Sequence, residues 1–428
     1  MKATTLSWRN FFKASCSALV FSMLLAVPIA FCAPGLNIAP PSSPVRLVFI
    51  HHSTGENWLA DSNGGLGVSL RDNNYFVSDT NYGWGPDSIG DYTDIGHWWL
   101  WFKGPDSGTY LAALYAEDGQ NCSYSRLGTA PAGPNEIIMF KSCFPNSALQ
   151  GSPDDPVPPI SSNPLRGQDS DSEYHTVANA KGIYIALLDY FRTRQDKLFV
   201  AVAAPPLSDT TYASNARALN QWLVNEWLKG YPYRNVVVFD FYNVLTTNGG
   251  GRNINDLGSA TGNHHRFWEG AVQHKTNGDN DPNPNVLEYP SGDDHPSRAG
   301  NLKATSEFQD LLNIFYNCWN DSGGCPRIPQ RPTGLSANAV SQNKITITWR
   351  DHSGYEAGFK VERKPGACGD SGSWARIALK GENKISHTDT GLSPNTTFSY
   401  RVRAYSAGGN SAYSNCASAT TGLPGTPS

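Results

Sequence analysis

The chain has 428 residues, of which 39% are hydrophobic and 16% are charged, so it can build two or three domains with buried cores. Its formal net charge of −4 provides no basic excess, which argues against a nucleic-acid partner. Two of the eight cysteines lie within residues 1–32, and the remaining even number is typical of disulfides formed in an oxidising compartment.

Residues 1–32 have the features of a secretory signal peptide. Lys2, Arg9 and Lys13 supply the positive start, and residues 18–31 supply the apolar core. The apolar run is short for a membrane span, and no second candidate follows. Without this segment the chain has 30 Lys+Arg and 37 Asp+Glu, a net charge of −7. We therefore expect an acidic protein secreted to the extracellular space or periplasm, with a Pro- and Ser-rich lead at 33–44.

The stretch Val45–Leu59 combines a buried strand with reactive side chains. Apart from Arg46, residues 45–50 form an apolar run typical of a strand that is buried on both faces. The run ends at His51, His52 and Ser53, which places the hydroxyl at the carboxyl end of the strand. Open α/β sheets bind their ligands at that edge. Ser53 is therefore a candidate nucleophile, although a serine here could also simply begin the next helix.

Further apolar runs alternate with amphipathic segments up to residue 320. Residues 136–140, 198–204 and 235–241 read as buried strands, and 177–191 and 219–227 as helices. Segment 64–94 reads as loop over short strands, and segments 151–172 and 249–294 read as irregular. A last helix follows His295 and Pro296. This alternation predicts an α/β domain over 45–320, with a mainly parallel sheet covered on both faces.

Beyond a Pro- and Gly-rich linker at 321–331, the pattern changes to short alternating strands with regularly spaced turns. The positions of Trp349, of Leu392 and of Tyr400, which begins the segment "YRVRAY", closely resemble those in a fibronectin type III domain. The resemblance implies an all-β sandwich over 332–422, followed by a tail at 423–428. Such modules are usually spacers or attachments that contact a glycan or another protein.

Three polar positions in the first domain can be read together. Ser53 follows the first strand, Asn146 in "KSCFPNS" follows a later one, and His295 precedes the last helix. Acyl transfer needs a nucleophile, a base and donors to the oxyanion. The order of these residues resembles the SGNH (GDSL-type) hydrolase family, which has a three-layer α/β/α fold and acts on esters.

The resemblance implies a role for each matching residue. Ser53 takes the place of the nucleophile, although Gly-Asp-Ser here reads His-His-Ser, and His295 takes that of the base. The backbone N–H groups of Ser53 and Gly83 and the Asn146 amide would bind the oxyanion. The final block normally reads Asp-x-x-His, but Gly292 stands at the Asp position. Asp293 is the preferred acid, and Asp294 or a Ser–His dyad without an acid stays open.

The substrate would be a carboxylic ester, with O-acetyl groups on polysaccharides as one candidate, and no cofactor is needed. The segment "GHWWLWF" could stack on sugar rings or pack in the core; its tryptophans are Trp98, Trp99 and Trp101. A non-catalytic glycan-binding or adhesion protein is one alternative. A metal-dependent hydrolase is another, with ligands drawn from His51, His52, His264, His265, Asp293, Asp294 and His295.

The cysteines allow fifteen connectivities. Pairing within each region would give Cys122–Cys143, Cys318–Cys325 and Cys368–Cys416.

Overall fold

The computed structural model describes residues 36–247, 262–268, 271–276, 285–320, 329–353, 356–406 and 409–424. The predicted signal peptide at 1–32 and most of the linker predicted at 321–331 lie outside these ranges. Across the ranges that are described, no helix combines the length and the apolar character that a membrane span requires.

A five-stranded sheet organises the first part of the chain. Its strands are β1 (Val45–Ile50), β2 (Tyr75–Thr80), β3 (Ile137–Lys141), β4 (Leu198–Val202) and β5 (Val236–Phe239). They are all parallel and lie in the order β2-β1-β3-β4-β5. Four of them match predicted strands. The segment predicted as loop over short strands contains β2. The sequence did not locate this strand because only its first half is apolar, although all six residues are buried.

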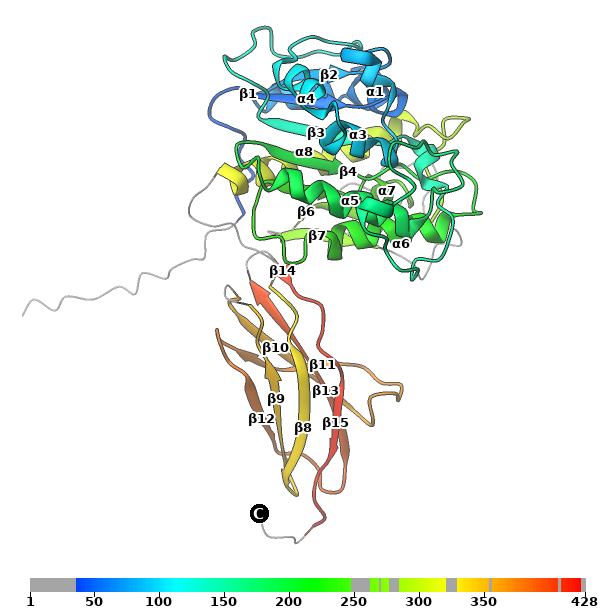
Figure 1. Ribbon diagram of the computed structural model, residues 1–428. Coiled ribbons are helices and arrows are strands. Elements are labelled where there is room, and N and C mark those ends of the chain that lie inside the picture. The colour runs from blue at the N-terminus through cyan, green and yellow to red at the C-terminus, as the bar shows by residue number, and fades with distance from the viewer. Residues whose placement is uncertain are drawn as a thin grey trace, which may run out of the picture. The chain divides into compact units, whose positions relative to one another are not determined.

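Helices cover both faces of this sheet (Figure 1). Val48 and Ile50 pack on one face, against α3 (Trp98–Lys103), α4 (Ser107–Ala116), α5 (Val177–Phe191) and α6 (Ala213–Trp222). Leu47 and Phe49 pack on the other, against α1 (Ser53–Leu59), α2 (Leu66–Asp72), α7 (Phe241–Val244) and α8 (Arg298–Asn320). Alternate residues of one strand thus enter two separate cores, as expected for a sheet buried on both sides.

An antiparallel pair, β6 (His264–Trp268) and β7 (Ala271–Lys275), lies within the segment predicted as irregular. His264, His265 and Arg266 interrupt the apolar alternation that would mark a strand, although all three are buried. Their burial depends on polar partners elsewhere in the chain, which a local pattern does not show.

The C-terminal part is a β-sandwich. One sheet contains β8 (Thr333–Ser341), β9 (Lys344–Arg350) and β12 (Ser386–Thr390). The other contains β10 (Gly358–Pro365), β11 (Ala375–Lys380), β13 (Thr397–Ser406), β14 (Gly409–Asn410) and β15 (Ala417–Thr420). Trp349, Leu392 and Tyr400 are buried in its core, as the sequence resemblance implied.

The cysteine pairing was predicted only in part. The Cys368–Cys416 disulfide is confirmed. Cys318 is also disulfide-bonded, whereas its predicted partner Cys325 lies outside the described residues. The Cys122–Cys143 pairing is wrong, because both thiols are free.

The strand order determines where a site can form. The chain passes from β1 to its neighbour β2 and then crosses to β3 on the other side of β1, from which the later strands continue outward. In open α/β sheets, a crevice forms at the carboxyl ends of the strands on either side of such a reversal. The segments that follow β1 and β3 are those that contain Ser53 and Asn146.

Candidate functional site

Ser53, His295 and Asp293 form a hydrogen-bonded chain. The Ser53 hydroxyl lies 2.8 Å from Nε2 of His295, and Nδ1 of His295 lies 3.0 Å from Oδ1 of Asp293. Ser53 begins α1, directly after β1, whereas His295 lies in the loop before α8. An N–H at Nδ1 that donates to the carboxylate leaves Nε2 free to accept the hydroxyl proton. This arrangement of nucleophile, base and acid can activate a hydroxyl for attack on a carbonyl.

The loop around His295 is held by short-range contacts. The Ser291 hydroxyl lies 2.8 Å from the His295 carbonyl oxygen and 2.9 Å from Oδ1 of Asp293. It can donate its one proton to either oxygen. The ring of Phe144, which follows β3, meets the imidazole edge-on with 4.9 Å between ring centroids. The orientation of His295 is therefore set from both sides, by a polar loop and by an aromatic side chain.

The structure distinguishes the two candidate acids. Oδ1 of Asp293 accepts hydrogen bonds from the backbone N–H of His295 (2.8 Å) and from its ring. Asp294 instead accepts from the backbone N–H of Ser208 (2.8 Å). The His295 backbone N–H, the Ser291 hydroxyl and the His295 ring together hold the pKa of Asp293 below its ordinary value. Of the two carboxylates, only Asp293 therefore orients the imidazole.

A buried polar cluster lies beneath Ser53. Sγ of Cys143 lies 3.7 Å from the Ser53 hydroxyl and 3.5 Å from that of Thr54. Lys141 is fully buried and donates to Thr54 and to the carbonyl oxygen of Ser142 (3.2 Å). Burial lowers the pKa of Lys141 to about 8. Burial alone would raise the pKa of Cys143, but Lys141 and the Thr54 and Ser53 hydrogen bonds outweigh it and lower that pKa.

Tyr82 lies over the same serine and was not singled out in the sequence. Burial raises the pKa of the Tyr82 hydroxyl, and the neighbouring Ser53 side chain and N–H partly oppose this shift, although the Tyr82 side chain as a whole is exposed. The Tyr82 ring stacks on His52, with centroids 3.9 Å apart. His52 accepts from Thr93 and donates to the Gly90 carbonyl oxygen (2.7 Å). Burial lowers the pKa of His52, so this ring acts as a neutral support for Tyr82.

The two oxyanion donors other than Ser53 that the family resemblance implied are already engaged within the chain. The Gly83 N–H donates to Asp91 (2.7 Å). The Asn146 amide donates to Asp94 (2.5 Å) and contacts the carbonyl oxygen of Cys143 (3.3 Å). Gly83 and Asn146 follow β2 and β3, so they come to the correct edge of the sheet, but their N–H groups point at other acceptors.

The predicted sugar-binding role of the tryptophans requires correction. Trp98 and Trp101 are fully buried in the core against α5, and their indole N–H groups donate to Ser142 and to the Tyr92 carbonyl oxygen. Trp99 is partly buried and packs against the same core. Large aromatic side chains contribute strongly to core stability when they are buried, so this cluster serves packing.

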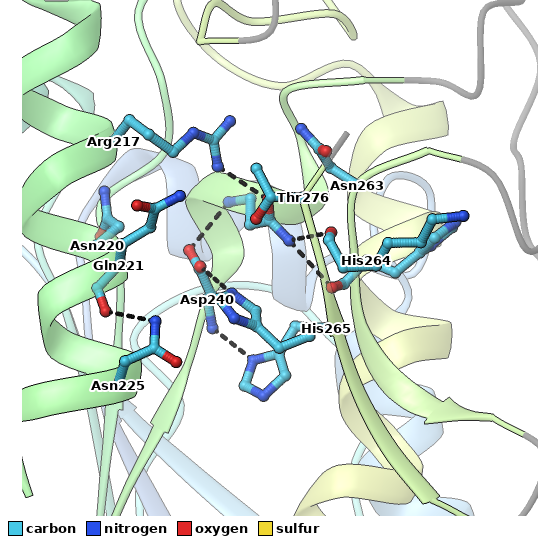
Figure 2. A network of polar contacts seen from close by, with 12 residues as sticks. Arg217, Asn220, Gln221, Asn225, Asp240, Asn263, His264, His265 and Thr276 are labelled. Carbon is cyan, nitrogen blue, oxygen red and sulfur yellow. Dashed lines mark hydrogen bonds and ion pairs between the residues drawn. The ribbon is translucent and has the colours of Figure 1, made fainter. Parts of the chain in front are cut away.

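The histidines proposed as one metal set lie in separate networks. His264 pairs with Glu307 (2.6 Å). Figure 2 shows His265 beside Asp240, whose backbone N–H donates to its Nδ1 (2.9 Å). Burial and the neighbouring His274 lower the pKa of His265 to about 3. His295 is bonded to Ser53, so the predicted ligand set does not converge on one ion.

Comparison with known proteins identifies the C-terminal region. Residues 330–420 match the fibronectin type III domain family, which confirms that part of the sequence interpretation. Similar solved structures include titin domains A168–A170 (21% identity, 23% of this chain, 34% of that chain, TM-score 0.21). FN3tt is 22% identical over 22% of this chain and 97% of its own, with a TM-score of 0.20. The FN5 domain of Drosophila Lar is 19% identical over 22% of this chain and 98% of its own, with a TM-score of 0.19.

The chain thus spans about a third of the first of these structures. No curated protein matches it.

Proposed function

We propose that residues 45–320 form a secreted serine esterase of the SGNH (GDSL-type) hydrolase class, with Ser53 as nucleophile, His295 as base and Asp293 as the orienting acid. The observation that carries the proposal is the 2.8 Å hydrogen bond between the Ser53 hydroxyl and Nε2 of His295, residues 242 positions apart in the chain. Support also comes from the parallel sheet with helices on both faces, and from the position of Ser53 at the carboxyl end of β1.

In this mechanism, His295 removes the Ser53 proton as the hydroxyl oxygen attacks an ester carbonyl. The tetrahedral intermediate collapses when His295 returns the proton to the leaving alcohol, and an acyl-enzyme remains. Water then attacks the acyl group in the same way and restores Ser53. Asp293 keeps the imidazole in the tautomer that accepts at Nε2 and stabilises the imidazolium that forms.

Short acyl groups are the substrates that we propose, with O-acetyl groups on polysaccharides as the natural candidate. Both Ser53 and His295 are partly exposed, which allows a large alcohol such as a glycan to remain in solvent while its acetyl group reacts. The burial of Trp98 and Trp101 removes them from substrate recognition, so any sugar contact must come from elsewhere.

Hydrolysis of p-nitrophenyl acetate and release of acetate from acetylated glycans by the full chain test this proposal. Ser53→Ala should reduce turnover by roughly 10⁴-fold or more while the far-ultraviolet circular dichroism is retained. Ser62→Ala, at an exposed serine in the loop after α1, is the matched control and should behave as wild type. A fluorophosphonate should label wild type and Ser62→Ala but not Ser53→Ala.

Equal turnover by Ser53→Ala and wild type would refute the mechanism. Absence of both turnover and labelling in the folded wild-type protein would refute the activity itself.

A further inference from the structure

A second group of reactive side chains lies behind the candidate active site. His51 at the end of β1, Asp79 in β2 and Cys122 in the segment after α4 bring their ligand atoms within 4.8 Å of one another. His51 and Asp79 are fully buried, and Cys122 is half-buried. Within the ranges that the structure describes, this is the one grouping of three or more such residues with metal-binding spacing.

The hydrogen bonds around His51 determine where its lone pair points. Nδ1 of His51 lies 2.9 Å from the carbonyl oxygen of His52, which can only accept, so Nδ1 carries a proton. Nε2 faces Oδ2 of Asp79 at 3.2 Å, and whenever it carries no proton it directs its lone pair to that side. Two acceptors at this distance repel each other unless a proton or a metal ion lies between them, so the pair offers two ligand atoms to a metal that replaces the proton. A histidine that donates its other N–H to a backbone carbonyl is also the usual arrangement of a metal ligand.

Asp79 is held in a way that leaves one oxygen available. Its Oδ1 accepts from the Tyr124 hydroxyl (2.8 Å) and from the backbone N–H of Asn121 (2.9 Å). Oδ2 is directed at His51, and Sγ of Cys122 lies within 4.8 Å of the ligand atoms of both residues. The residues on either side of Cys122 therefore fix the carboxylate, while Cys122 itself completes the group. Ligand carboxylates in metal sites are commonly fixed by hydrogen bonds of this kind.

The distances and atom types fit one class of metal. Sγ of Cys122 lies 3.9 Å from Nε2 of His51. Ligands at Zn–N and Zn–S distances of about 2.0–2.3 Å in a tetrahedron are separated by roughly 3.3–3.6 Å, so small shifts would complete the geometry. Nitrogen and sulfur ligands disfavour Mg²⁺ and Ca²⁺ and favour Zn²⁺.

We propose that His51, Asp79 and Cys122 bind one divalent ion of the zinc class, with water as the fourth ligand. On binding, the Cys122 thiol releases its proton to solvent and the thiolate coordinates the metal. The ion would join the ends of β1 and β2 to the segment after α4. Because His51 lies two residues before Ser53, this site would also stabilise the backbone from which Ser53 projects. The proposal does not depend on the esterase assignment.

The metal content of the full chain tests the site directly. Wild-type protein purified without chelator from zinc-supplemented medium should contain one zinc per chain by inductively coupled plasma mass spectrometry. Cys122→Ser should lose the metal. Cys143→Ser, at the other free thiol in the described part of the chain, should retain it. Equal zinc in wild type and Cys122→Ser would overturn the proposal, as would zinc-free wild type.

A second measurement needs no variant. Wild-type protein that is dialysed against chelator and loaded with Co²⁺ should show a thiolate-to-cobalt charge-transfer band and the intense visible bands of a tetrahedral site. Absence of the charge-transfer band in folded protein would exclude coordination by Cys122. Both readouts are independent of ester hydrolysis, so loss of either proposal leaves the other intact.

Discussion

Substitution of the acid next to His295 gives the sharpest test of the site geometry. Asp293 and Asp294 are adjacent and carry the same charge, but only Asp293 contacts the His295 ring. Asp293→Asn removes the negative charge beside the imidazole and can keep an oxygen at the Oδ1 position. Asp294→Asn removes the same charge one residue away and can keep the bond to the Ser208 N–H. The pair therefore separates contact with His295 from general charge effects.

The exposure of Asp293 sets the expected magnitude. Its side chain is 65% exposed, so water screens its attraction for the imidazolium that forms during catalysis. Attraction between unit charges about 3 Å apart in water corresponds to roughly a tenfold change in rate. We therefore expect Asp293→Asn to lower kcat/KM by about tenfold, far less than the loss of about 10⁴ seen when a buried triad aspartate is replaced. Asp294→Asn should stay within about twofold of wild type by the same Coulomb reasoning.

The assay is hydrolysis of p-nitrophenyl acetate at neutral pH, with thermal unfolding of each variant as a check on folding. The pKa of Asp293 is lowered chiefly by the His295 backbone N–H, so the wild-type carboxylate is charged at this pH. Its stabilising contribution is lost only as the pH falls through that lowered pKa. A larger loss in Asp294→Asn than in Asp293→Asn would refute the assignment, and wild-type activity in Asp293→Asn would indicate a Ser–His dyad.

Two further predictions concern groups that contact or support Ser53. Tyr82→Phe should lower kcat by about tenfold or more with little change in KM, because the Tyr82 hydroxyl adjoins the Ser53 N–H where the oxyanion would form. Tyr92→Phe is the matched control. An unchanged kcat in Tyr82→Phe would contradict this role. The pKa of Lys141 is about 8 in the folded chain and 10.5 in the unfolded chain. Between these pH values the folded state binds fewer protons than the unfolded state. The free energy of unfolding should therefore rise with pH in this window, by at most about 3 kcal/mol. The free energy of unfolding of Lys141→Met, measured with urea across this pH window, should not show that rise. An identical dependence on pH in wild type and Lys141→Met would contradict the prediction.

Local patterns were sufficient to predict the elements that place the candidate pair Ser53 and His295. All of residues 45–50 except Arg46 are apolar because that strand is buried on both faces, and the change to polar residues after Ile50 marks the carboxyl edge of the sheet. His295 was recognisable because α8 follows it with a regular apolar stripe. These signals lie within a few residues of the side chains that they position, so sequence alone could locate Ser53 and His295.

Contacts between distant segments left no comparable signal. Asp79 is buried at the polar end of β2, and its partners His51 and Cys122 come from segments 28 and 43 residues away. Tyr82 looks like an ordinary loop residue until its ring is seen stacked on His52. For the tryptophans of α3 the sequence suggested a sugar-binding surface, whereas they pack in the core. An aromatic-rich segment beside loops is compatible with either location. Burial of whole side chains depends on tertiary packing, which periodicity does not determine for a helix of six residues.

The candidate oxyanion donors differ in whether their N–H groups are available to bind an anion. Gly83 and Asn146 lie at the expected edge of the sheet, but Asp91 and Asp94 accept their N–H groups. A donor that is already bound to a carboxylate must break that bond before it can stabilise a second anion, which removes much of the benefit of preorganisation. The Ser53 N–H instead adjoins the exposed Tyr82 hydroxyl, a neutral group that an entering carbonyl oxygen can displace more readily than a carboxylate. In the proposed esterase, the displaced hydroxyl can then donate to the same oxygen, so the oxyanion site would be formed by Ser53 and Tyr82.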